Sequence, residues 1–214
     1  MLILLSYKYM TNEDMKLEEI ANIKTGLVLA RKKANENAVE KYMYKFITLK
    51  SISNFGSLDT NYFNELKSKE KLSHDYLSQK GDIIIRISEP YTAIYITDEF
   101  SNKIIPSSFY IIRLINRNIL SEYLAWYLNS ECAKKQFMTH NISSTVNIIQ
   151  SSSLRQMKIQ VPDLDKQKLI VNIQKLYLKE ITLLDELNME KQKIYKIAFK
   201  KYIKNNFQDC VGRR

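Results

Sequence analysis

Hydrophobic and polar positions along the chain predict short elements over its first three quarters. Residues 45–52 alternate between apolar and polar side chains, as in a half-buried strand. The run 83–87 is β-branched and apolar, as in a buried strand. By the same criteria, strands are expected at 45–52, 83–87, 91–97, 109–114 and 157–161, a short amphipathic element at 15–23, and a helix at 122–137.

The last quarter of the chain has a helical pattern. From Asp163 to about Asn205 there is no glycine or proline, and helix-forming residues dominate. Apolar residues recur three or four positions apart, except at a gap of seven where Lys191 occupies the stripe. At 1.5 Å per residue this helix is roughly 60 Å long, too long for the neighbouring domain alone to cover. A helix from another chain is therefore expected on the apolar stripe, formed by Ile170, Ile173, Tyr177, Ile181, Leu184, Leu187 and Ile194.

These patterns predict an α+β protein in which a mixed α/β domain precedes one long helix. The change of composition after Pro162 sets the main boundary. We therefore expect a domain at 1–161, a long spacer and dimerisation helix at 162–206, and a flexible tail at 207–214.

The charge of the chain narrows the class of partner. Lysine and arginine number 33 against 23 aspartate and glutamate residues, which gives a formal net charge of +10. This excess favours a polyanionic partner, nucleic acid first and an anionic membrane surface second. The alternative is solubility alone, since surface lysine is common. The two cysteines lie far apart, and no run of about 18 apolar residues occurs, so we expect a cytoplasmic protein without a membrane span.

Catalytic interpretations fail for lack of the required residues. The four scattered glycines cannot build a phosphate-binding loop. A nuclease-type metal site could begin at Pro162-Asp163, but no Glu-x-Lys triplet follows at a useful distance. The two histidines, His74 and His140, stand alone, so a zinc site would lack ligands. We expect no catalytic residue, no metal and no cofactor on this chain.

Basic residues fall in or beside the predicted loops, interleaved with tyrosine, serine, threonine and asparagine. Lysine and arginine would neutralise phosphates, and the smaller polar side chains could reach base edges. Surface lysine in turns is common, however, so many of these residues would touch no DNA. The candidates for backbone contacts are Lys24, Arg31, Lys32, Lys33, Lys50, Lys67, Lys69, Lys71 and Arg86.

The order of several segments is more specific than any one of them. The segments are Leu17–Gly26, Ile47–Asp59, the Gly-Asp-led strand in Leu77–Ser88, the helix at Ser121–Ser130, the Ser/Thr loop at Ser143–Ile148, the strand at Leu154–Pro162, and the start of the long helix at Lys166–Ile170. Together they resemble the specificity subunits of type I restriction–modification enzymes, over residues 17–207. The chain departs from the family at three places. It has Lys166-Gln167 where the family usually has Glu-Gln, and Pro162-Asp163 where the family often has Pro-Pro. It has Ser143 where the family commonly has a glycine before the Ser/Thr loop.

This resemblance implies a target recognition domain that reads DNA sequence, followed by a spacer helix. A complete specificity subunit has two such domains and two helices packed antiparallel, and this chain has one of each. It is therefore expected to be a half-subunit, a fragment or a donor of an exchangeable domain, paired as a homodimer or with another half-subunit. Its implied partners are double-stranded DNA, modification (methyltransferase) subunits and a restriction subunit. S-adenosylmethionine, ATP and Mg would be bound by those subunits.

The same resemblance suggests where bases are read. Base readout is expected at the end of the strand 83–87, near Arg86, Ser88, Glu89 and Tyr91. In the Ser/Thr loop, phosphate contacts are expected near Ser144 and Thr145, and Asn147 is a further DNA-binding candidate. Two alternatives remain beside a specificity subunit. One is a stand-alone DNA-binding regulator, or a decoy that titrates modification subunits; the other is an enzyme with an unrecognised site.

Overall fold

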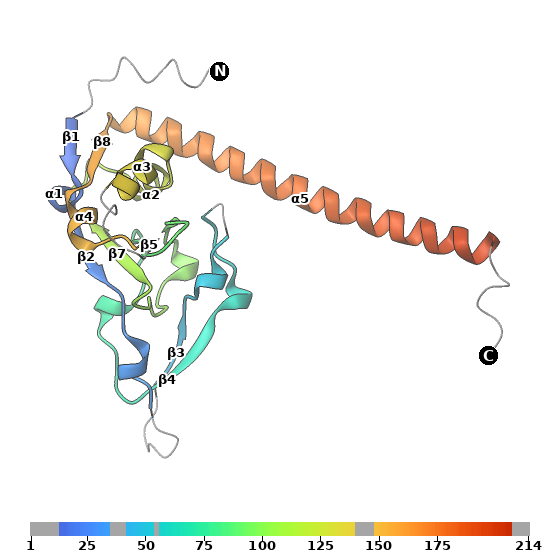
Figure 1. The fold of residues 1–214 in the computed structure, drawn as a ribbon, viewed down its shortest axis with the longest axis horizontal. Helices are drawn as coiled ribbons and strands as arrows, with labels where there is room; N and C mark the ends of the chain where they lie inside the picture. Colours follow the sequence, from blue (N-terminus) through green and yellow to red (C-terminus); the bar gives the residue numbers. More distant parts are fainter. Residues whose placement is uncertain (1–12, 35–41, 54–55, 140–147, 207–214) are drawn as a thin grey trace. The chain divides into compact units, whose positions relative to one another are not determined.

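The structure is a computed structural model in which residues 13–34, 42–53, 56–139 and 148–206 are described (Figure 1). It comprises two compact units, residues 1–171 and residues 172–214. The first unit contains antiparallel sheets and short helices together with the first two turns of the long helix. The second contains the remainder of that helix. This arrangement confirms the expected α+β class.

A four-stranded antiparallel sheet forms the centre of the first unit. Its strand order is β2 (Ala21–Thr25), β7 (Phe109–Leu114), β5 (Ile83–Arg86) and β6 (Ala93–Tyr95). The three isoleucines of β5 are fully buried because core residues cover the sheet on both faces. Ile83 and Ile85 pack in one apolar cluster and Ile84 in another, as the alternation of strand side chains requires.

Helices and a small second sheet pack beside the first of these clusters. They are α1 (Leu17–Ile20), α2 (Ser121–Leu128), α3 (Glu131–Thr139), α4 (Ser151–Gln156), and the antiparallel pair of β1 (Glu13–Lys16) with β8 (Lys158–Val161). The long helix α5 (Leu164–Asn206) begins here. Gln167 in its first turn is fully buried, donates to the carbonyls of Asn118 and Pro162, and accepts from the Leu120 N–H. The side chain of Gln167 thus satisfies the hydrogen-bonding capacity of three backbone groups in the adjoining loops.

A two-stranded antiparallel ribbon packs on a third, smaller cluster. It consists of β3 (Tyr42–Phe46) and β4 (Asn64–Ser68), which run side by side in Figure 1. Its inner face carries Tyr44 and Leu66, which pack with residues such as Ile104. The Tyr44 hydroxyl accepts a hydrogen bond from the Leu72 N–H (3.1 Å), which ties the ribbon to the following loop.

Three element predictions were wrong in extent. The single element expected at 15–23 is divided among β1, α1 and β2. The strand expected at 45–52 ends at Phe46, because Thr48 and Ser51 bond each other's backbone N–H groups and form a short 3-10 helix, η3 (Leu49–Ser51). The helix expected at 122–137 is two helices, because the chain breaks at Asn129, whose side chain bonds both backbone groups of Ala93 on β6. Periodicity alone cannot foresee such side chain-to-backbone bonds.

Candidate nucleic-acid interface

Sheet pairing brings together the two basic clusters that lie 36 residues apart in the sequence. The Ala34 N–H donates to the Lys67 carbonyl (2.8 Å) and the Lys69 N–H donates to the Lys32 carbonyl (3.0 Å). Lys33 and Ser68 form a bridge between them. One side chain of the group is neutralised, since Lys32 forms an ion pair with Glu70, which holds the pKa of that carboxyl below its usual value. We call this group the basic cluster: Arg31, Lys32, Lys33, Lys67, Lys69 and Lys71.

Lys50 lies at the rim of a cleft of about 540 Å³ beside the ribbon. Asn61, Tyr62 and Asn64 also line this cleft, and all three are exposed. None of these three residues was among the predicted DNA contacts, because the segment 58–71 has no regular apolar pattern that would place its side chains. The Asp59-Thr60-Asn61 triplet is a usable signal, since Asp59 caps the 3-10 helix η4 (Thr60–Tyr62) by accepting from the Asn61 N–H.

The candidates after strand β5 have different environments. Arg86 is partly buried, and among the described residues its Nε has no hydrogen-bond partner. Burial lowers the pKa of its guanidinium. Ser88 forms a bridge with Ile148, the residue that follows Asn147, and the Ile149 N–H donates to the Ile87 carbonyl (2.8 Å). Arg86 is therefore a cation held near the protein surface without a described counterion.

The other two candidates in this turn, Glu89 and Tyr91, differ in how far they are exposed to solvent. Glu89 is exposed, whereas the Tyr91 ring is 2% exposed and packs against Phe137, with ring centroids 5.5 Å apart. Because Tyr91 is buried, its side chain packs in the core, and we do not propose it as a DNA contact. Ser144, Thr145 and Asn147 lie outside the described residues.

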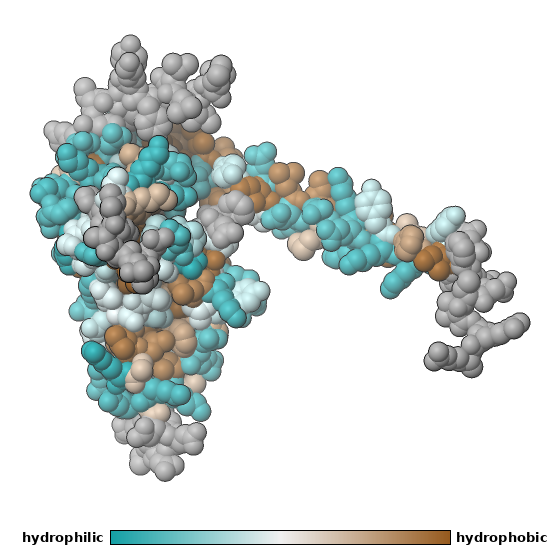
Figure 2. All heavy atoms as spheres, viewed as in Figure 1, coloured by the Kyte–Doolittle hydropathy of each residue, from teal (hydrophilic) through white to brown (hydrophobic). Residues whose placement is uncertain are grey.

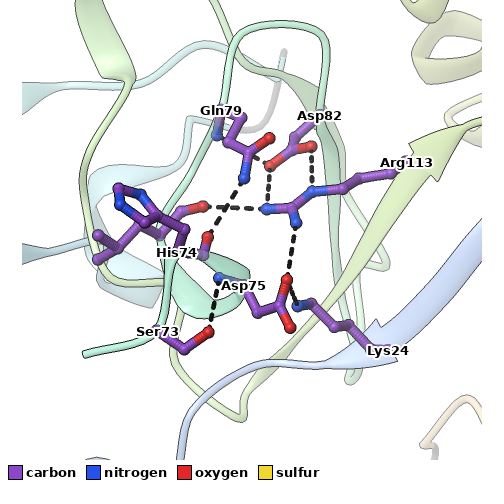
Figure 3. Close-up of polar contacts among 8 residues, drawn as sticks. Lys24, Ser73, His74, Asp75, Gln79, Asp82 and Arg113 are labelled. Atoms are coloured by element: carbon purple, nitrogen blue, oxygen red, sulfur yellow. Dashed lines mark hydrogen bonds and ion pairs between the residues drawn. The ribbon is translucent and has the colours of Figure 1, made fainter.

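Lys24 belongs to an ion-pair network and not to an open basic surface (Figure 3). Its Nζ lies 3.3 Å from Asp75 Oδ1 and above the Tyr76 ring, and burial lowers its pKa. Arg113 lies between two carboxylates in Figure 3. Its Nε donates to the buried Asp82 at 2.8 Å, and its Nη1 is 3.5 Å from Asp75.

This network explains the Gly-Asp motif as an architectural feature. Gly81 has φ +89°, a conformation that favours glycine, and it orients Asp82 toward the sheet. Asp82 accepts from the Gln79 N–H (2.9 Å) and from Arg113 on β7. The motif therefore joins the start of β5 to the neighbouring strand.

Helix α5 exposes the predicted apolar stripe in the described chain. Ile173, Leu184 and Leu187 are each more than half exposed, as are Tyr177 and Ile194, while Ile170 and Ile181 are half-buried. A second stripe, which the sequence analysis missed, has a spacing of seven, interrupted once by Glu190: Leu169, Leu176, Leu183 and Ile197 are 54–68% exposed. Figure 2 shows hydrophobic (brown) side chains among hydrophilic (teal) ones along the helix. The apolar face of α5 is therefore broader than one seam.

Neither metal-binding clusters nor membrane-spanning helices occur in the part of the chain that the structure describes. No group of three or more histidine, cysteine, aspartate or glutamate side chains there could hold a metal ion. No described helix is long and apolar enough to cross a membrane.

A sheet domain with a joined basic cluster, followed by a long amphipathic helix, places the chain in the class of nucleic-acid-binding proteins. Residues 10–206 match the family model described as the type I restriction modification DNA specificity domain. The match spans most of the chain, so the protein belongs to this family, and the resemblance seen in its motifs is confirmed.

Solved structures agree with the fold. The HsdS subunit from Thermoanaerobacter tengcongensis matches with a TM-score of 0.63 and 15% identity, covering 91% of this chain and 49% of that one. A structure concerned with complex assembly of the type I R-M system matches with a TM-score of 0.68 and 15% identity, covering 97% and 52%. The S subunit from M. genitalium matches with a TM-score of 0.57 and 11% identity, covering 93% and 47%. The chain thus spans about half the length of these proteins. No curated protein matches it significantly.

Proposed function

We propose that this protein is a non-catalytic specificity subunit that reads one half of a bipartite duplex DNA target in the cytoplasm. It directs partner methyltransferase subunits, and a restriction subunit where one is present, to that target. Those partners bind S-adenosylmethionine, ATP and Mg. The basic cluster is the observation that carries the proposal. The family match identifies the class of protein, whereas the basic cluster is a surface of this chain that could bind phosphates.

The charge of the surface around the ribbon supports phosphate binding. Outside the Lys32–Glu70 ion pair, the other five members of the basic cluster are exposed. Among the described residues none of the five forms an ion pair. Such side chains release counterions when they meet phosphates, which makes binding strongly dependent on salt. They position the protein on DNA, and other residues supply the sequence preference.

The broad apolar face of α5 supports pairing with more than one helix. The stripe through Leu184 fits a second copy of this chain, or another half-subunit, packed antiparallel in a coiled coil. The stripe through Leu176 then remains for a helix of a modification subunit. Two copies related by a two-fold axis would present two recognition domains to one duplex.

A selection experiment tests the proposed function. The full-length chain is incubated at low salt with a random duplex library, and bound DNA is recovered and sequenced over several rounds. We expect one enriched half-site, inverted and repeated at a fixed separation, because a rigid helix pair fixes the distance between the domains. Recovery of sequences with no common motif, from a chain shown to be folded, would contradict specific recognition.

A further inference from the structure

The β3–β4 ribbon has one packed face and one open face. The packed face holds Tyr44 and Leu66 against the small cluster around Ile104, and Ile104 also bonds the β3 backbone: its N–H donates to the Lys45 carbonyl (2.9 Å), and its carbonyl accepts from Ile47. The ribbon is thereby held to the domain at its base and along its inner side. It is a supported surface and not a free hairpin.

The open face presents four exposed side chains in two cross-strand pairs. Met43 stands opposite Lys67, and Lys45 opposite Glu65. We call these four residues the outer face. Met43 is 53% exposed, and no hydrogen bond or ion pair of the Lys45, Glu65 and Lys67 side chains occurs among the described residues. Their polar groups are therefore available to a ligand.

The cations around the outer face select an anionic ligand. Lys67 belongs to both the outer face and the basic cluster, whose segment Lys32–Ala34 forms a bridge to the end of β4, on the edge away from β3. Arg31, Lys33, Lys69 and Lys71 thus lie on the β4 side of the ribbon. Among the described residues the nearby carboxylate of Glu65 forms no ion pair. The basic cluster would bind phosphates at the edge of the ribbon. The outer face, which carries charges of both signs and one apolar side chain, would contact the bases.

The size of the ribbon fits one groove of duplex DNA. Two strands about 4.8 Å apart form a unit that the major groove, about 12 Å wide, admits, and the minor groove, about 6 Å wide, does not. Five residues per strand at about 3.4 Å per residue extend for roughly 17 Å, the length of about five base pairs. Outward side chains on one strand are about 7 Å apart, so they reach alternate base pairs.

We propose that the β3–β4 ribbon enters the major groove and that its outer face reads base edges there. Lys45 and Lys67 match the O6 and N7 acceptors of guanine, Glu65 matches the N4 donor of cytosine, and Met43 offers an apolar contact to a thymine methyl group. The basic cluster, which lies on the β4 side of the ribbon, binds the phosphates along that side of the groove. This inference rests on the proposed function, and it identifies the element that reads sequence.

Glu65 gives the sharpest test, because a carboxylate opposes phosphate binding but specifies a base. In the selection described above, Glu65→Gln should lose discrimination at one base-pair position by on the order of tenfold to a hundredfold. Its affinity for random duplex should stay equal or rise, since a negative charge is removed. The matched control is Glu99→Gln, the same exposed change on the 3-10 helix η6 (Asp98–Phe100), which should select the wild-type sequence.

Lys45→Gln and Lys135→Gln form a second matched pair, since Lys135 is exposed on α3. Lys45→Gln should alter one position of the selected sequence, whereas Lys135→Gln should not. Because all four side chains are exposed, thermal melting should show folded variants. A measurement on the unmutated chain does not depend on folding of a variant: on the selected duplex, dimethyl sulfate should be excluded from guanine N7, in the major groove, within the half-site.

The outcomes separate this inference from the proposed function. If the unmutated chain selects no sequence, the proposed function fails and the inference fails with it. If it selects a sequence that both ribbon variants also select unchanged, the function stands and the ribbon is not the reading element. Guanine N7 left open throughout the half-site, with protection of adenine N3, would place the protein in the minor groove and overturn the inference.

Discussion

At the scale of single residues, Arg86 combines a stability cost with a proposed binding role. A partly buried guanidinium with an unpartnered Nε costs stability, and DNA oxygen atoms would supply its acceptors. We predict that Arg86→Met leaves the urea unfolding midpoint equal or higher while weakening binding of the selected duplex about tenfold or more. Chemical denaturation and fluorescence titration measure the two effects. A destabilised variant with unchanged affinity would show that Arg86 only supports the fold.

Asp82 should behave in the opposite way, since its role is architectural. Asp82→Ala leaves the Arg113 guanidinium without its buried partner. The expected loss is about 2–4 kcal/mol of unfolding free energy, below the range for fully buried pairs because Arg113 is partly exposed to water. Asp98→Asn is the control, because Asp98 forms an ion pair with Lys80 on the surface and its removal should hardly move the unfolding midpoint. Equal midpoints for both variants would contradict this account.

The sequence predicted which single residues are charged, but not which of them meet an oppositely charged partner in the fold. Lys67 and Lys69 stood out as basic residues in a polar segment, but their proximity to Lys32 comes from sheet pairing, which no local pattern encodes. Lys24 looked similar and lies in an ion-pair network, because Asp75 is brought to it by the fold. Composition identifies charges, whereas only tertiary register determines which of them are neutralised.

At the scale of elements, the basic cluster should control the salt dependence of DNA binding. We predict that Lys33→Gln with Lys69→Gln reduces the slope of log affinity against log salt by about 1–2, since each lost phosphate contact removes close to one released counterion. Lys135→Gln with Lys179→Gln removes the same charge elsewhere and should change the slope less. Equal slopes for the two double variants would place the phosphate-binding surface elsewhere.

The helix α5 should determine association of the chain. Lysine at Ile181 and Leu184 would place charges in the expected helix–helix seam, which costs several kcal/mol. We predict that Ile181→Lys with Leu184→Lys is monomeric by light scattering at micromolar concentration, whereas the unmutated chain is dimeric. A matched double change on the polar side, Lys179→Gln with Glu186→Gln, should remain dimeric. A monomeric unmutated chain would remove the main support for pairing through this seam.

Elements were predictable where one physical signal dominated. The strand at Phe109–Leu114 was predicted with its observed bounds, and the long helix to within two residues at each end, because an uninterrupted apolar or helical pattern decides them. The ribbon strand β4 was missed. Its alternation of Leu66 and Ser68 with exposed residues is short, and β4 forms because β3, from another part of the chain, pairs with it.

At the scale of the whole molecule, the symmetry of the pair determines the form of the target. Two identical chains paired through antiparallel helices present the same ribbon to the two halves of one duplex on opposite strands. The target is then an interrupted palindrome, whose unread spacer has a length fixed by the helix pair. An asymmetric bipartite target would instead indicate pairing with a different half-subunit.

The most direct test of the account is the methylated sequence motif in cells where this chain is the specificity protein. Genomes from cells with and without the gene are sequenced by a method that detects methylated bases. The account predicts that an interrupted palindrome is methylated when the gene is present and unmethylated when it is absent, and that Glu65→Gln alters one position in each half-site. Identical methylation with and without the gene would contradict the claim that this protein directs modification to DNA.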